Sequence, residues 1–276
     1  MRLTLAITTF ERPDALAAVL ASVGRQRDAP EELIVADDGS TDPTRSVIEA
    51  FSAAAPFPVR HVRQEHRGAR VTRLRNLAIA RARGEFIVLV DGDMLLHPDF
   101  IADHRRHALR GTWTQGVRLH LAAQATARLI ANTGALPGFA SSGLGGVRRL
   151  YALRAPRLAS AMRRPANAVI AIKSCNQGFW REDLVAVNGF NEEMVGWGPE
   201  DKELCARLAQ RGIARQTLLF GGLAWHLHHP PASRERREAN EAVLERTRAR
   251  RLDRCAHGLD AHLSGYRLPP SAYRPE

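Results

Sequence analysis

Long apolar runs are absent from this chain of 276 residues, although 45% of its residues are hydrophobic. No stretch approaches the roughly 18 apolar residues that a membrane-spanning helix needs. Met1 is followed almost at once by a predicted strand, so the sequence predicts no secretory signal peptide. We therefore expect a single globular unit in the cytoplasm.

Cysteine is also scarce. Cys175, Cys205 and Cys255 are the three in the chain, and their spacing matches no metal-binding pattern. So few cysteines indicate a reducing compartment, with one disulfide as the open alternative. Cys205 falls on the apolar side of a predicted helix, where we expect it to be part of the core.

Motifs of two functional classes are missing. The sequence has neither paired aromatic residues on RNP-like strands nor a C₂H₂ set of zinc ligands, so we expect no nucleic-acid partner. A nucleotidyltransferase normally carries a glycine-rich phosphate loop with a lysine near the first strand. The segment Thr8-Thr9-Phe10-Glu11-Arg12 lacks that loop.

Acidic residues are absent from His104 to Arg181, an arginine-rich stretch in a chain of formal net charge +11. A glycine-rich break spans residues 134–146, and apolar side chains then interleave with the arginines, as on an interfacial helix: Leu150, Tyr151, Leu153, Leu158 and Met162. The positive electrostatic field of this stretch attracts phosphate-rich surfaces, and one interpretation is that the stretch contacts an anionic membrane. A solvated basic face is the other.

Strands and helices alternate in the first part of the chain. Apolar runs predict strands at residues 3–8, 32–36, 59–63 and 86–90, with an amphipathic helix at 15–26. The alternation implies parallel βαβ units, in which ligands bind beyond the carboxyl ends of the strands. Asp37 and Asp38 follow the second strand and could reach the ribose or base of a nucleotide there. The alternative is a cap for the helix that starts near Thr44.

Asp91-Gly92-Asp93 directly follows the last of these strands. Side chains alternate along a strand, so residues two apart should emerge on one face and both carboxylates converge on one ion. Oxygen ligands suit Mg²⁺ or Mn²⁺, either of which neutralises the charge of a departing diphosphate. An ordinary strand-to-loop exit is the alternative, because Asp and Gly are common turn residues.

Glu200 and Asp201 open a predicted helix behind Pro199. The positive end of the helix dipole should keep a carboxylate ionised, and an ionised carboxylate can act as a base. Simple helix capping is the alternative. Just before the helix, glycines flank Trp197, which predicts a mobile loop with an aromatic stacking surface.

Three histidines follow the helix at positions 226, 228 and 229. On a strand, His226 and His228 would share one face and could supply an imidazole to a metal held by Asp93. A cluster of surface histidines before a double-proline turn is the alternative.

An ordered set of motifs in the first part of the chain resembles the family 2 glycosyltransferases of the GT-A fold. The set comprises Ile7-Thr8-Thr9-Phe10-Glu11-Arg12-Pro13, Asp37-Asp38-Gly39-Ser40, Arg75-Asn76 and Asp91-Gly92-Asp93. The resemblance implies an α/β fold with a Rossmann-like, mostly parallel sheet flanked by helices, and a C-terminal part for acceptor and catalysis. It implies Asp93 and Asp91 as metal ligands and the following nucleotide contacts: Thr8, Glu11, Asp37, Asp38, Arg75 and Asp91.

The segment from Cys175 to Leu208 resembles the Gly-Trp-Gly-x-Glu-Asp region of galactosyltransferase-like enzymes. The resemblance implies that Asp201 is the base of an inverting displacement, that Glu200 positions the acceptor and that Trp197 lies over donor and acceptor. It also implies a metal-binding histidine after this helix, which favours His226 over His228. Lys202 stands where the animal enzymes continue with Asp, so the acceptor does not follow from the resemblance.

Together these patterns predict a metal-dependent inverting glycosyltransferase that uses Mn²⁺ or Mg²⁺. The galactosyltransferase resemblance implies that it moves galactose, N-acetylgalactosamine or a related hexose from a UDP-sugar to a hydroxyl of a glycan or glycolipid. The alternative is a nucleotide-sugar-binding relative with nucleotidyltransferase activity or none. A processive polysaccharide synthase would need membrane spans and, by family resemblance, a Gln-x-x-Arg-Trp motif, and both are missing.

The predicted organisation has four parts. Residues 1–110 form the nucleotide-sugar-binding half, and 111–166 form a basic, glycine-containing insertion that contacts the acceptor or the inner face of a membrane. Residues 167–231 form the catalytic and acceptor half, and 232–276 form a helix and tail.

Overall fold

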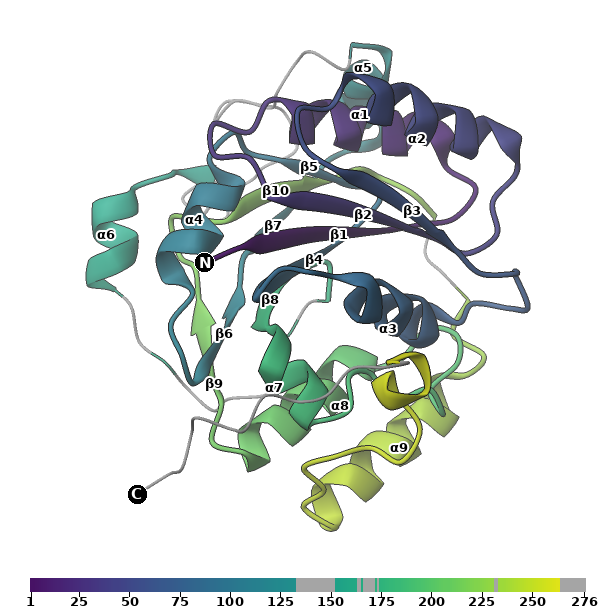
Figure 1. Ribbon diagram of the computed structural model, residues 1–276, viewed down its shortest axis with the longest axis vertical. Helices are drawn as coiled ribbons and strands as arrows, with labels where there is room; N and C mark the ends of the chain where they lie inside the picture. The colour runs from purple at the N-terminus through teal and green to yellow at the C-terminus, as the bar shows by residue number, and fades with distance from the viewer. Residues whose placement is uncertain (133–151, 163–164, 166–171, 173, 231–232, 264–276) are drawn as a thin grey trace.

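The computed structural model describes residues 1–132, 152–162, 165, 172, 174–230 and 233–263, and these residues build a large sheet of seven strands (Figure 1). In spatial order the strands are β3 (Val59–Arg63), β2 (Glu32–Asp37), β1 (Leu3–Thr9), β4 (Phe86–Asp91), β8 (Asn176–Trp180), β6 (Thr112–Gln115) and β9 (Ala214–Thr217). The first four strands run parallel, and β8 is antiparallel to both of its neighbours. The predicted α/β fold with a mostly parallel sheet is confirmed.

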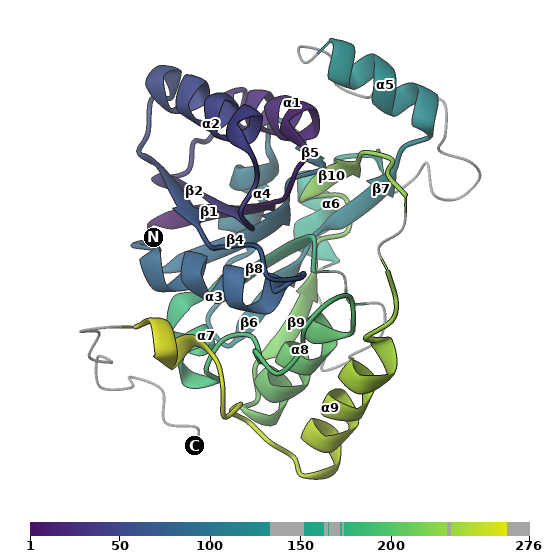
Figure 2. The same cartoon turned by 90° about the vertical axis from the view of Figure 1, so that its right-hand side faces the viewer.

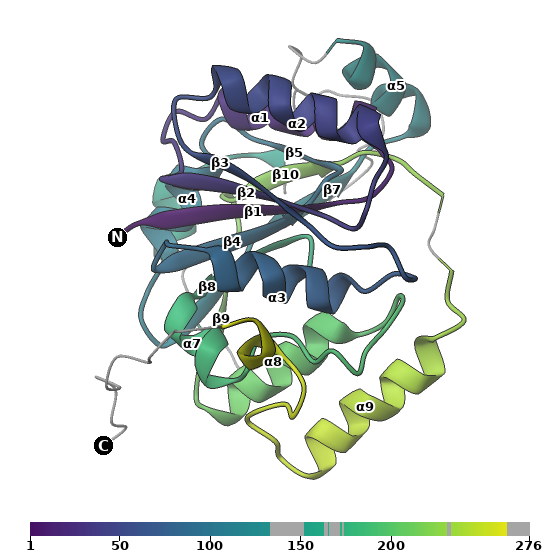
Figure 3. The ribbon, with the colours of Figure 1, turned by 45° about the vertical axis from the view of Figure 1, so that its right-hand side comes forward.

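Helices cover both faces of this sheet (Figures 1 and 3). One face packs against α1 (Pro13–Gly24) and α2 (Asp42–Ala54), and the other against α3 (Val71–Arg81), α7 (Arg181–Ala186) and α8 (Glu200–Gln210). Strand alternation explains the two layers, because Leu5 and Ile7 of β1 join one apolar cluster and Ala6 joins the other. The other helical segments are α4 (Phe100–His107), α5 (Ala123–Ala131), α6 (Pro156–Ala161), α9 (Arg237–Ala249) and a 3₁₀ turn, Leu259–His262.

A small second sheet extends the carboxyl edge of the large one (Figure 2). Its central strand β10 (Leu223–His226) pairs with β5 (Met94–Leu96) on one side and β7 (Val117–His120) on the other. Because β5 starts directly after Asp93 and His226 pairs with Met94, this sheet brings the end of β10 beside the end of β4.

The segment predicted as a basic insertion contributes to both sheets, since it supplies β6 and β7. Leu153, Leu158 and Met162 are exposed, whereas the 134–146 break, Leu150 and Tyr151 lie outside the described residues. The three cysteines are free and buried, so the disulfide alternative is wrong and the core position of Cys205 is confirmed. Within the described residues, no helix has the length and apolar character to cross a membrane.

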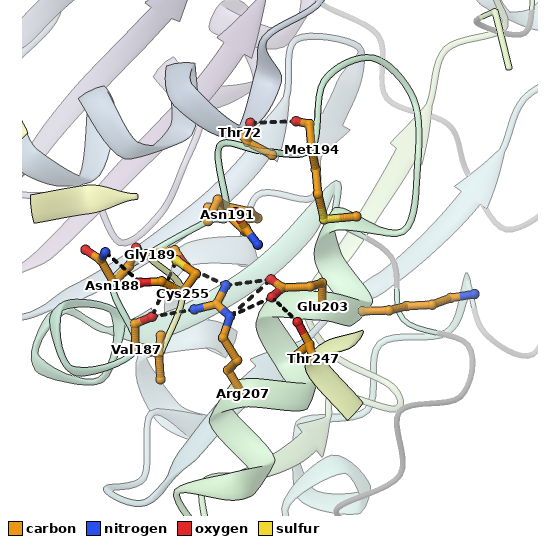
Figure 4. A network of polar contacts seen from close by, with 12 residues as sticks. Thr72, Val187, Asn188, Gly189, Asn191, Met194, Glu203, Arg207, Thr247 and Cys255 are labelled. Carbon is orange, nitrogen blue, oxygen red and sulfur yellow. Dashed lines mark hydrogen bonds and ion pairs between the residues drawn. The ribbon is translucent and has the colours of Figure 1, made fainter. Parts of the chain in front are cut away.

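A buried ion pair anchors α8 (Figure 4). Arg207 has no solvent exposure and donates to both carboxylate oxygens of Glu203, one turn earlier, at 2.7–3.1 Å. Arg207 also donates to the carbonyl oxygen of Gly189 at 2.8 Å, while Thr247 of α9 donates to Glu203 at 2.9 Å. The network ties α8 to its neighbours and so positions the first turn of the helix, where Glu200 lies.

Candidate active site

Arg75 joins the two acidic clusters that the sequence singled out. Arg75 lies on α3, and its side chain is almost fully buried. Its Nη2 atom lies 3.1 Å from Oδ1 of Asp91, and its Nη1 atom lies 3.0 Å from Oε1 of Glu200. Thr8 donates to the same Asp91 oxygen at 3.1 Å. One guanidinium therefore connects the end of β4 to the start of α8, and the candidate nucleotide and catalytic residues lie at one edge of the sheet.

A metal-ligand cluster lies beside this bridge. Asp93, His226 and His229 each offer one ligand atom, and these atoms lie within 4.8 Å of one another. Oδ2 of Asp93 is 3.2 Å from Nε2 of His229, whereas buried Oδ1 has no hydrogen-bond partner and lies 3.7 Å from Nε2 of His226. A buried carboxylate oxygen without a partner is costly. A divalent cation among these three side chains would provide that partner.

We expected Asp91 and Asp93 to share one strand face, and His226 and His228 another, and both expectations are wrong. The strand ends at Asp91, so Gly92 and Asp93 turn away from it, and Asp91 does not join the described cluster. Likewise β10 ends at His226, so His228 does not share its strand face. The backbone N–H of His228 donates instead to Thr126 of α5, and His229 reaches Asp93.

Arg12 also contacts Asp93. Its Nη1 atom lies 3.1 Å from Oδ2, and the guanidinium is part-exposed. Arg12 directly precedes α1 and comes from the loop after β1.

Asp201 and Glu200 are both largely buried at the start of α8. Oδ2 of Asp201 accepts from the backbone N–H of Ser174 at 3.0 Å, and Oδ1 accepts from that of Lys202 at 2.7 Å. We expected the helix terminus to favour the ionised form, but burial dominates: it raises the pKa of Asp201 and raises that of Glu200 to about 7. A raised pKa makes each carboxylate a stronger base once it is ionised.

Asp37 and Asp38 are engaged inside the protein. Oδ2 of Asp37 lies 3.0 Å from Nε2 of His61, and Oδ2 of Asp38 lies 3.0 Å from Nδ1 of His66. His66 stacks on the exposed ring of Phe10 with centroids 4.2 Å apart. Burial alone would raise the pKa of Asp37, but hydrogen bonds from His61 and from the hydroxyl and backbone N–H of Ser40 outweigh it and lower that pKa. These aspartates therefore orient two imidazoles and an aromatic surface at the same edge.

Glu11 and Trp197 lie on loops around the site. The carboxylate of Glu11 accepts from the backbone N–H and hydroxyl of Thr41 at 2.7 and 2.9 Å. Trp197 is 45% exposed, and the guanidinium of Arg234 lies 5.2 Å from the centre of its ring. Gly198 leaves no room for a Cβ, which would lie 2.4 Å from the side chain of Asn240 in α9. The aromatic surface is thus presented by a loop packed against α9.

Several residues of this edge were missed from sequence. His229 is three residues beyond His226, and the His-x-x-His spacing was a usable signal. No sequence signal indicated Arg118. It pairs in β7 with Ala224 of β10, which lies on the same strand face as His226. The side chain of Arg118 hydrogen-bonds the buried Cys175. The ring of His120, on the same face of β7, lies 5.0 Å from that of His226.

The fold is that of the GT-A glycosyltransferases. The structure of Staphylococcus aureus TarS 1–349 in complex with UDP superposes with a TM-score of 0.63 at 16% identity, covering 95% of this chain and 68% of that one. The mannosyltransferase PcManGT from Pyrobaculum calidifontis, in complex with GDP-Man and Mn²⁺, superposes with a TM-score of 0.57 at 20% identity, covering 97% of this chain and 76% of that one.

Two family models match separate regions of the sequence. Residues 4–118 match glycosyl transferase family 2, and residues 158–230 match the N-terminal domain of galactosyltransferase. Both matches are to glycosyltransferase models, and together they indicate a glycosyltransferase that is similar to family 2 in its N-terminal part and to galactosyltransferases in its C-terminal region.

Curated relatives are longer than this chain. Validoxylamine A glucosyltransferase from Streptomyces hygroscopicus subsp. limoneus is 27% identical over 76% of this chain and 48% of its own length. Hyaluronan synthase from Pasteurella multocida is 27% identical over 87% of this chain and 26% of its own length. The chain thus spans about half of the first relative and about a quarter of the second.

Proposed function

We propose that this chain transfers one hexose from a UDP-sugar to an acceptor hydroxyl, with inversion at the anomeric carbon and with a divalent metal. The observation that carries the proposal is the convergence of Asp93, His226 and His229 within 4.8 Å, beside the Arg75 bridge to Glu200. Donor-side and acceptor-side carboxylates then lie at one edge, as a direct displacement between the two substrates requires.

Asp93, His226 and His229 would hold the ion. The unpartnered Oδ1 atom fits a cation, and a carboxylate with two imidazoles suits Mn²⁺ better than Mg²⁺, which prefers oxygen ligands. When bound, the metal stabilises the negative charge of the departing diphosphate. The mannosyltransferase of the same fold holds Mn²⁺ with its nucleotide sugar, which supports this choice.

Asp201 is the proposed base. An oxygen of its carboxylate would take the proton of the acceptor hydroxyl, while the N–H groups of Ser174 and Lys202 hold the side chain in orientation. Glu200 is proposed to position the acceptor. Arg75 keeps Glu200 in place and compensates its charge when it is ionised.

On the donor side, Asp91 is the most open of the acids around Arg75, with 33% of its side chain exposed. We propose that Asp91 and Thr8 contact the ribose and that the Phe10–His66 stack, held by Asp38, lies beside the base. Asp37 and Glu11 would support this surface from behind through their internal hydrogen bonds.

Galactose, N-acetylgalactosamine or a related hexose is the proposed sugar, supported by the match of residues 158–230 to a galactosyltransferase model. We propose a glycan or lipid-linked acceptor, with Trp197 stacking on a sugar ring. Exposed Leu153, Leu158 and Met162, within the arginine-rich stretch, support peripheral contact with an anionic membrane.

The test is UDP release by the purified chain from a panel of UDP-hexoses, with Mn²⁺ or EDTA and with a panel of sugar acceptors. We expect Mn²⁺-dependent release that an acceptor stimulates and that Asp93→Ala abolishes. Release that persists in EDTA would overturn the metal mechanism. Tight UDP binding without turnover of any donor would instead indicate a nucleotide-sugar-binding protein.

A further inference from the structure

Arg12 forms an ion pair with Asp93, the carboxylate that would bind the proposed metal. Its Nη1 atom lies 3.1 Å from Oδ2 of Asp93, the same oxygen that His229 approaches at 3.2 Å. In the described part of the chain, Asp93 is the one carboxylate that pairs with Arg12. The guanidinium of Arg12 therefore compensates the negative charge of Asp93.

The loop that carries Arg12 holds it in this position. Glu11 has a left-handed φ of 46°, which is uncommon for a residue with a side chain. Its backbone N–H donates to the hydroxyl of Ser40 at 2.9 Å, and its carboxylate binds Thr41. The carbonyl oxygen of Arg12 accepts from the N–H of Leu16 in the first turn of α1 at 3.0 Å. Both sides of the loop are thus anchored, and the guanidinium points at Asp93.

A guanidinium and a divalent cation cannot share one carboxylate without mutual repulsion. Metal binding at Asp93 therefore disfavours the Arg12 contact. A guanidinium released at this edge has a suitable new partner in a diphosphate, which it can bind through two parallel hydrogen bonds.

We propose that Arg12 is an exchangeable counter-ion: the metal displaces it from Asp93, and the donor diphosphate then binds it. This inference rests on the proposed metal site. In this arrangement Arg12 weakens the binding of metal alone and strengthens the binding of nucleotide in the presence of metal. Metal and UDP should then raise each other's affinity by the same factor.

The test is calorimetric titration of the full chain with MnCl₂, without nucleotide and with saturating UDP, for wild type and Arg12→Gln. For wild type we expect UDP to tighten Mn²⁺ binding by a factor of about 5 to 150, the usual range for coupled sites. For Arg12→Gln we expect Mn²⁺ alone to bind about 5-fold more tightly or better, and the coupling factor to shrink correspondingly.

Three variants complete the design. Arg12→Lys keeps the charge and should keep most of the coupling. Arg45→Gln removes an exposed positive charge of α2 that pairs with Asp42 and not with Asp93, so an equal gain in Mn²⁺ affinity there would show a net-charge effect and overturn the proposal. Asp93→Asn should abolish Mn²⁺ binding in either background.

The outcomes separate two failures. If Asp93→Asn binds Mn²⁺ normally, the proposed metal site itself is wrong. If Asp93→Asn loses Mn²⁺ but Arg12→Gln binds it no more tightly than wild type, the site stands and the exchange is wrong. Wild type without coupling between Mn²⁺ and UDP overturns the exchange as well, even if Arg12→Gln fails to fold.

Discussion

Nη1 of Arg75 lies 3.0 Å from Oε1 of Glu200, although the two residues are 125 positions apart in the chain. The same guanidinium binds Asp91, and its carbon atom lies 5.2 Å from the ring centre of Phe190. Arg75 is therefore a buried cation that fixes the distance between the proposed donor and acceptor carboxylates.

Replacing Arg75 tests this bridge. Arg75→Gln should destabilise the fold by about 3–5 kcal/mol, because two carboxylates lose their buried partner. Urea unfolding measures the loss. Arg81→Gln is the matched control, since Arg81 lies at the exposed end of the same helix and should change stability by less than about 0.5 kcal/mol. Equal losses in the two variants would contradict the bridge.

A matched pair of variants tests which histidine binds the metal. His229→Ala should weaken Mn²⁺ affinity by about 10-fold or more, whereas His228→Ala should leave it unchanged. The reason is that His229 reaches Asp93 while His228 lies beyond the strand, beside α5. Calorimetric Mn²⁺ titration decides, and a loss confined to His228→Ala would reverse the assignment.

Asp201→Asn should separate binding from chemistry. The amide is nearly isosteric but cannot accept a proton, so the rate should fall on the order of 10²–10⁴-fold. Affinity for UDP and Mn²⁺ should stay close to wild type, because Asp93 and the Asp37–Asp38 turn are untouched. Turnover is measured together with UDP calorimetry. Near-normal kcat would reject Asp201 as the base, and collapsed UDP affinity would move it to the nucleotide site.

Glu200 should make stability depend on pH. Burial is the main cause that raises its pKa from 4.5 to about 7, with nearby Asp201 adding to the rise and Arg75 opposing it. A carboxyl whose pKa is higher in the folded state stabilises the fold most below its unfolded pKa and loses that contribution as pH rises. In urea unfolding, the free energy of unfolding of Glu200→Gln should therefore rise relative to that of wild type as the pH increases from 4.5 to 7.5. A constant difference across this range would contradict the raised pKa.

The buried pair under the proposed catalytic helix gives a further prediction. Glu203→Gln leaves Arg207 as an uncompensated buried charge and should cost about 3–5 kcal/mol. Adding Arg207→Met should recover much of this loss, since no buried charge then remains. Urea unfolding of the two variants provides the comparison. A double variant no more stable than the single one would mean that the pair acts through more than its charge.

Local sequence signals were sufficient for much of the fold. The apolar run at residues 3–8 lies within β1, Leu3–Thr9, and the run at 86–90 lies within β4, Phe86–Asp91. A continuous apolar run is a reliable signal there because both strands are buried on both faces. The tail helix predicted after residue 232 exists as α9 with narrower bounds, Arg237–Ala249.

The site was predicted less completely, because strand ends cannot be located from residue type. For Asp93 to share a face with Asp91, or His228 with His226, each strand would have to continue for two more residues. Instead β4 ends at Asp91 and β10 ends at His226, and His229 joins Asp93 and His226 in the metal-ligand cluster. The contact of Arg12 with Asp93 could not be predicted either, because it depends on how the loop after β1 packs against the end of β4.

The sequence alone determined the α/β class and the order of the motifs, because these depend on apolar runs and on residues close together in the chain. The tertiary structure decided which side chains meet: Arg75 with Glu200, and Asp93 with His229 and Arg12. It also decided the ionisation of Glu200, since burial outweighs the helix terminus there. Contacts and desolvation depend on segments distant in sequence, and only the folded chain brings those segments together.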